Sequence, residues 1–143
     1  PLRGELFAAA RGQGATLNGQ PIAVSGTVDV GRALVVSGIQ SDDRAVVQSA
    51  MERVQALINT VRAVRLPGSP ALSLSYVASG RAEAFCHGCI NSWDVAAGAL
   101  LVEEAGGRVT RYQGPWALDV QQASSILGSN GRVHESLLRV LNR

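Results

Sequence analysis

Residues 91–107 read NSWDVAAGALLVEEAGG, and this stretch carries the clearest structural signal in the chain. Eight of the twelve residues after Trp93 are apolar, which is typical of a helix that is largely buried. Gly106 and Gly107 follow the apolar run and are expected to end this helix. One carboxylate, that of Asp94, stands at the very front. The stretch therefore predicts a buried helix with a single charge at its N-terminal end.

Outward from this helix, predicted strands and helices alternate, which indicates a mixed α/β fold. Asn18-Gly19 is a strong hairpin turn signal. Ser41 is a candidate N-cap for a long helix, and Ser69-Pro70 opens a shorter one that Gly80 ends. We expect strands at 5–10, 14–18, 21–25, 33–37, 61–66, 82–86, 108–112 and 125–128, a turn at 113–119, and helices at 41–59, 70–79, 93–105 and 133–141.

Composition narrows the class of protein. With 143 residues, 46% of them hydrophobic and 17% charged, the chain fits one globular domain. The longest apolar run is too short for a membrane span, so we expect no membrane partner. All 13 basic residues are arginines, and they are scattered along the chain, which argues against nucleic-acid binding. The sequence contains no lysine, which argues against Walker-type phosphate loops and Schiff-base chemistry. Two cysteines favour a cytoplasmic location.

Three groups of residues could carry chemistry. Asp94 could cap its helix, or it could face a cleft and bind a hard cation such as Mg²⁺. Gly68-Ser69 could present backbone donors to a phosphate or polyol, or could be an ordinary N-cap. Cys86-His87-Gly88-Cys89 contains a C-x-x-C motif, and His134 is the only other histidine in the chain. The motif could bind zinc, could act as a redox pair, or could consist of two thiols with neither role.

Taken together, these stretches resemble the inositol monophosphatase family of Mg²⁺-dependent sugar phosphatases. ELFAAARGQGATLNGQPIAVS is similar to the family's β-hairpin segment, and RLPGSPALSLSYVASGRAEAF to its glycine–serine helix and following strand. WDVAAGALLVEEAGGRVT is similar to its C-terminal signature, and SSILGSNGRVHESLLRVL to its closing strand and helix. The resemblance implies a layered sandwich of mixed sheet and helices, of which residues 1–143 form the C-terminal portion.

The resemblance also implies roles for five residues. Asp94 would bind both a metal and the substrate, and Gly68, Ser69 and Pro70 would contact the substrate's sugar or polyol. His87 stands where many members carry a glutamate that accepts hydrogen bonds from substrate hydroxyls. The chain lacks the family's D-P-x-D-G-T motif, so no catalytic set is complete here. It has no starting Met and no signal peptide, so we expect it to begin inside a longer gene product and in the middle of a sheet.

The function implied is Mg²⁺-dependent hydrolysis of a phosphate monoester by the intact protein, with the isolated chain inactive. The substrate would be a small phosphorylated sugar or polyol. The alternative is a non-catalytic domain that binds a sugar phosphate or a protein partner. An exposed strand edge near 5–10 predicts either a homodimer or pairing with an N-terminal half.

Overall fold

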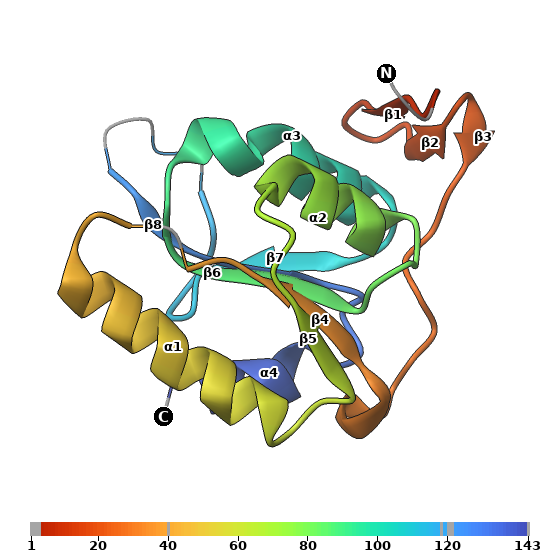
Figure 1. Ribbon diagram of the computed structural model, residues 1–143. Coiled ribbons are helices and arrows are strands. Elements are labelled where there is room, and N and C mark those ends of the chain that lie inside the picture. Colours follow the sequence, from red (N-terminus) through yellow and green to blue (C-terminus); the bar gives the residue numbers. More distant parts are fainter. Residues whose placement is uncertain (1–3, 40, 118, 120–121, 143) are drawn as a thin grey trace.

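The computed structural model describes residues 4–39, 41–117, 119 and 122–142, and its layers are visible in Figure 1. Its strands are β1 (Phe7–Ala9), β2 (Ala15–Leu17), β3 (Gln20–Pro21), β4 (Leu34–Ser37), β5 (Ala63–Arg65), β6 (Ala84–Ile90), β7 (Arg108–Thr110) and β8 (Ser124–Ser129). Its α-helices are α1 (Arg44–Ile58), α2 (Pro70–Ala78), α3 (Ser92–Glu104) and α4 (His134–Leu141), and a 3-10 turn spans Val30–Arg32. The mixed α/β layered architecture expected from the sequence is confirmed.

A five-stranded sheet forms the middle layer, with strand order β5-β4-β6-β8-β7. Strands β5, β4 and β6 are parallel, whereas β8 runs antiparallel to both β6 and β7. Helices α2 and α3 cover one face of the sheet, and α1 and α4 cover the other (Figure 1). After β4 the chain continues into α1, and after β6 it continues into α3. These two neighbouring parallel strands are therefore followed by helices on opposite faces of the sheet. Open α/β sheets bind ligands at the carboxyl ends of such strands.

Each face of the sheet buries its own apolar core. Phe85 of β6 packs with Leu74 of α2 and Val102 of α3 on one face. Ala84 and Cys86, which alternate with Phe85, face the other side. Burial on both faces fixes the strand register, because a slip by one residue would exchange the two sets of side chains.

A second, three-stranded antiparallel sheet, β1-β2-β3, lies near the C-terminal end of α3 (Figure 1). The predicted turn is confirmed, since Asn18 and Gly19 both have positive φ, at 51° and 77°. The carboxylate of Glu104 accepts hydrogen bonds from the amides of Gly12 and Gly14, each at 2.8 Å. Glu104 at the end of α3 therefore fastens the β1–β2 loop to the main body.

Three predicted elements differ from the structure. The strand expected at 21–25 ends at Pro21, which has no N–H to donate, and Val24 instead donates to the carbonyl of Ala105 (3.1 Å). Helix α1 begins at Arg44 rather than beside Ser41, because Asp43 is its N-cap and accepts from the amide of Ala45 (2.8 Å). Strand β6 runs on to residue 90 instead of ending at 86.

The remaining boundaries agree within two residues. In the predicted turn at 113–119, residue 118 lies outside the described residues. None of the helices described is long and apolar enough to cross a membrane.

Candidate functional site

Helices α2 and α3 run in the same direction and begin at the same side of the molecule (Figure 1). Their first residues meet the end of β6 around a cavity of about 270 Å³. This cavity, called here the α2–α3 cavity, is lined by Gly68, Pro70, His87, Cys89, Ile90, Asn91 and Asp94. The structure thus brings together four of the five predicted site residues, and Ser69 lies between two of them in the chain.

Asp94 is the third residue of α3, three positions after the N-cap. The N-cap is Asn91, whose side chain makes no capping hydrogen bond. Asp94 is exposed, and its carboxylate accepts no hydrogen bond and forms no ion pair within the part of the chain that the structure describes. The geometry therefore does not use Asp94 as a cap and leaves both of its oxygens available to a ligand.

The start of α2 offers backbone donors to the same cavity. Ser69 is the N-cap, and its hydroxyl accepts from the amide of Leu72 at 3.4 Å. Gly68 has φ of +79°, which a residue with a side chain rarely adopts. The amides of Gly68 and Ser69 donate to no other described residue. Both the predicted cap and the predicted free donors are therefore present.

His87 lies on the α2–α3 side of β6, buried at 6% exposure. Its Nδ1 accepts a hydrogen bond from the amide of Cys89 at 3.2 Å. Burial is the main cause of the lowered pKa of the imidazole, and the charge of Asp94 opposes it. A neutral ring whose Nδ1 accepts must carry its proton on Nε2. His87 therefore offers a donor where the resemblance led us to expect an acceptor.

The two cysteines do not form a metal or redox site. Cys86 is buried, and burial raises the pKa of its thiol to about 11, whereas Cys89 is exposed. His134, the remaining possible zinc ligand, is held by Ser129 (2.7 Å) and Thr110 (2.9 Å). Both thiols are free, which agrees with the alternative that they have neither a metal-binding nor a redox role.

Within the described ranges, no three His, Cys, Asp or Glu side chains form a group that could hold a metal ion. Asp94 nevertheless fits one position of a Mg²⁺ site, because its carboxylate is a hard oxygen donor without a competing partner. A Mg²⁺ ion demands near-octahedral oxygen coordination, which a single carboxylate cannot complete. The described residues thus supply one protein ligand at most from this cavity.

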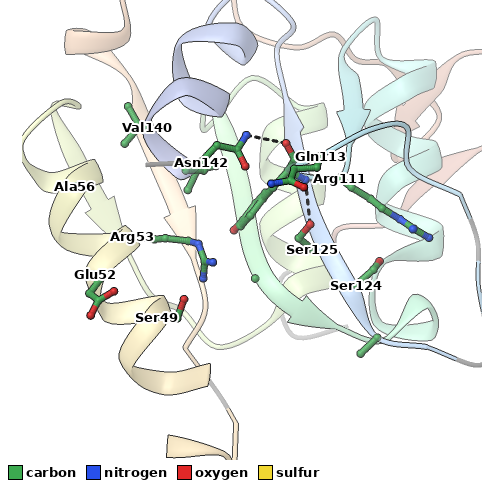
Figure 2. Close-up of a pocket in the computed structure, with 14 residues that line it drawn as sticks. Ser49, Glu52, Arg53, Ala56, Arg111, Gln113, Ser124, Ser125, Val140 and Asn142 are labelled. Atoms are coloured by element: carbon green, nitrogen blue, oxygen red, sulfur yellow. Dashed lines mark hydrogen bonds between the residues drawn. The ribbon is translucent and has the colours of Figure 1, made fainter. Parts of the chain in front are cut away.

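Sequence reasoning missed a second cavity on the opposite face of the sheet, of about 560 Å³ (Figure 2). It lies between α1, α4 and β8 and is called here the α1–α4 cavity. Its lining includes Ser49, Arg53, Gly88, Ser124, Ser125 and Asn142. Arg53 is not among the predicted site residues, although helical spacing places it on the same face of α1 as Ala50 and Leu57.

These features define an α/β protein with a cavity where strand β6 ends and helices α2 and α3 begin. A model of the inositol monophosphatase family matches residues 1–143. Nus factor SuhB of Xylella fastidiosa is 38% identical over 145 residues, covering 99% of this chain and 53% of the relative. Inositol-1-monophosphatase of Synechocystis is 39% identical over 141 residues, covering 99% of this chain and 48% of the relative. The chain belongs to the inositol monophosphatase family.

Solved structures agree with this assignment. Inositol monophosphatase from Anabaena (Nostoc) superposes with a TM-score of 0.88 at 39% identity, covering 99% of this chain and 58% of that one. An IMPase/NADP phosphatase, 28% identical with a TM-score of 0.79, has been solved with Mg²⁺ and phosphate, and a dual-specific one with D-inositol-1-phosphate. These two cover 96% of this chain and about half of their own length. The chain spans about half the length of the curated relatives it matches.

Proposed function

We propose that the intact protein hydrolyses a small phosphate monoester with Mg²⁺, and that this chain supplies the substrate side of the site and one metal ligand. The observation that carries the proposal is the unpaired carboxylate of Asp94, which lies in one cavity with Gly68, Pro70 and His87. Family membership supports phosphatase chemistry. A cytoplasmic location belongs to the same proposal and is supported by the two free thiols.

Each residue has a role that follows from its geometry. Asp94 gives an oxygen to Mg²⁺, and the other ligands come from residues outside this chain. Bound Mg²⁺ supplies Lewis-acid polarisation of the phosphoryl group. The amides of Gly68 and Ser69 bind acceptor atoms of the substrate, because they are unused and lie where α2 begins.

His87 narrows the substrate class. Its Nε2–H donates, so it pairs with an acceptor such as a carbonyl, ether or phosphoryl oxygen. A carboxylate at this position would repel a second anionic group on the substrate, and a neutral imidazole does not. Because hydroxyl oxygens also accept hydrogen bonds, only the charge argument separates substrates, and it favours a phosphorylated sugar or polyol that presents a second anionic group to His87.

The test is Asp94→Asn in the full-length protein that contains this chain. Turnover should fall by about a hundredfold or more, the scale of one lost electrostatic contact in a transition state. Calorimetry should show weaker Mg²⁺ binding, because the metal loses an anionic oxygen. The melting temperature without metal should change only slightly, because Asp94 makes no capping hydrogen bond and contributes only a first-turn charge to α3. Wild-type turnover and unchanged Mg²⁺ affinity in the variant would overturn the proposal.

Asp43→Asn provides the matched control. Asp43 is a true N-cap, at the start of α1, and asparagine caps helices about as well as aspartate. This variant loses the same charge at a helix start away from the α2–α3 cavity, so turnover and Mg²⁺ affinity should match those of the wild type.

A second candidate function is binding of a sugar phosphate or a protein partner without hydrolysis. One observation favours it: some curated relatives carry the name Nus factor. Under this alternative the full-length protein binds phosphate esters but releases no phosphate above a buffer blank.

A further inference from the structure

The α1–α4 cavity contains the positive charge of Arg53, which forms no ion pair with the residues that the structure describes. Arg53 extends from α1 toward β6, whereas Glu52 beside it points away (Figure 2). The carboxylate of Glu52 is occupied by the side-chain amide of Gln48 at 3.0 Å. No carboxylate of the described residues pairs with Arg53. A half-buried guanidinium without a counter-ion is unfavourable, because both its charge and its donors lose water.

The surroundings hold this guanidinium in one place. Its carbon lies 5.4 Å from the centre of the Tyr112 ring, within the range of a cation–π contact. Its Nη1 lies 3.1 Å from where a β-carbon on Gly88 would be, so the missing side chain at 88 makes room for it. Arg53 is therefore positioned by its neighbours before any ligand arrives, which reduces the entropy lost on binding.

Tyr112 is itself fixed from both sides. The hydroxyl of Ser125 accepts from the Tyr112 amide at 3.0 Å, and the side-chain amide of Asn142 donates to its carbonyl at 2.8 Å (Figure 2). These contacts leave the Ser125 hydroxyl proton and the Asn142 side-chain oxygen free for a ligand. The charged residues that line the cavity are Arg53, Arg111 and Glu52, and the Glu52 carboxylate accepts from Gln48. The other polar lining groups are neutral, and the cavity volume lies in the range of small-molecule sites.

We propose that the α1–α4 cavity is a second ligand site, which binds a small polar molecule through a phosphate or carboxylate group held by Arg53. A guanidinium recognises these two oxyanions because its parallel N–H donors match their oxygens. The hydroxyl and amide groups around Arg53 select a ligand that also carries hydroxyls. A third cavity adjoins both sites, because it shares Arg53 and Gly88 with the α1–α4 cavity and His87 and Cys89 with the α2–α3 cavity. The proposed second site does not depend on the proposed phosphatase activity.

Inorganic phosphate is the probe for the test. The ¹⁵N-labelled chain is titrated with sodium phosphate while sodium chloride keeps the ionic strength constant. NMR follows the Gly88 amide and the Arg53 Nε–H. Both signals should shift and saturate. Arg53→Gln should weaken the binding measured at Gly88 by about tenfold or more, the effect of a lost charge-assisted pair.

Two further variants keep the result interpretable. Arg44→Gln removes an exposed arginine from the same helix and should bind like the wild type. Arg53→Lys keeps the charge and the stem but loses the paired donors, so its affinity should lie between those of the wild type and Arg53→Gln. Circular dichroism verifies that each variant is folded.

Equal affinity of the wild type and Arg53→Gln would overturn the proposal. Shifts confined to Gly68 and Ser69 would also overturn it, because phosphate would then bind only at the α2–α3 cavity. That second result leaves the proposed phosphatase function standing. Conversely, saturable shifts at Gly88 support this site even if Asp94→Asn proves to be catalytically neutral.

Discussion

A β-carbon on Gly98 would lie 2.6 Å from the β-carbon of Leu74, so α2 and α3 touch where only glycine fits. Leu74 is fully buried and also lies against Gly128, so it has no room to retreat. Gly98→Ala should therefore lower the free energy of unfolding by about 1–3 kcal/mol, the usual cost of overpacking a core. Urea denaturation measures this. Gly26→Ala is the control, because its β-carbon meets nothing within 4 Å, and its stability should change by less than about 0.5 kcal/mol.

The Glu104 carboxylate should control the order of the β1–β2 loop. Hydrogen bonds from Gly12 and Gly14 lower its pKa, so the attachment is present above the ordinary carboxyl pKa and is lost as pH falls through the lowered one. Glu104→Gln removes the charge and should speed amide hydrogen exchange at Gly12 and Gly14. Its neighbour Glu103 is exposed and makes no such contact, so Glu103→Gln should leave these rates unchanged. Equal rates in both variants would contradict the attachment.

Stability should fall in mild acid because of His134. Burial lowers its pKa from 6.5 to about 4, so between these values the unfolded chain takes up a proton that the folded chain refuses. The stabilisation is complete above about pH 6.5 and is lost on the way down to about pH 4, to a total of up to about 3 kcal/mol. Urea denaturation at pH 7 and at pH 4.5 tests this. His134→Gln should start less stable but show a shallower pH dependence, and an identical slope would contradict the assignment.

The proton of His87 should reside on Nε2. The amide of Cys89 donates to Nδ1, and the lowered pKa keeps the ring neutral at pH 7. Long-range ¹H–¹⁵N NMR spectra distinguish the two nitrogens by their shifts. Nδ1 should appear as the unprotonated nitrogen. A protonated Nδ1 would remove the basis for treating His87 as a donor to substrate.

Strand β1 lies at an edge of its sheet, as the order β1-β2-β3 shows. An exposed edge pairs with other chains, so the isolated chain should self-associate as its concentration rises in sedimentation experiments. Ala8 is an exposed residue in β1, and Ala8→Lys should weaken this association through charge repulsion at the edge. Ala10→Lys lies just beyond the strand and should have less effect. A wild-type chain that remains monomeric at high concentration would contradict the prediction.

Local signals in the sequence were sufficient for the helices that frame the site. The start of α2 is identified by Ser69 and Pro70 and its end by Gly80, and α3 is identified by the apolar run after Trp93. The placement of Asp94 and Gly68 in one cavity came from family resemblance, because residues so far apart in sequence meet only through the parallel packing of two helices.

Features that depend on distant partners were not predictable. The proton position of His87 depends on the backbone direction at Cys89, next to an irregularity in the pairing of β6 with β8. Helical spacing places Met51 and Ile58 on one apolar face of α1 with Leu57, yet these two side chains are 55% and 59% exposed. Helical periodicity predicts which residues share a face of the helix, but packing against neighbouring elements decides which face is buried. Here the side chain of Arg53 passes over Gly88 toward the sheet.

The shared direction of α2 and α3 has an electrostatic consequence. Each helix carries about half a positive charge at its start, and two like ends side by side repel where antiparallel neighbours would cancel. The Asp94 carboxylate, in the first turn of α3, offsets part of this repulsion at the α2–α3 cavity. At the far end of α3 the sign is reversed and disfavours the carboxylate of Glu104, which the amides of Gly12 and Gly14 offset. The molecule is thus polarised along α3, positive toward the ligand and negative toward the small sheet.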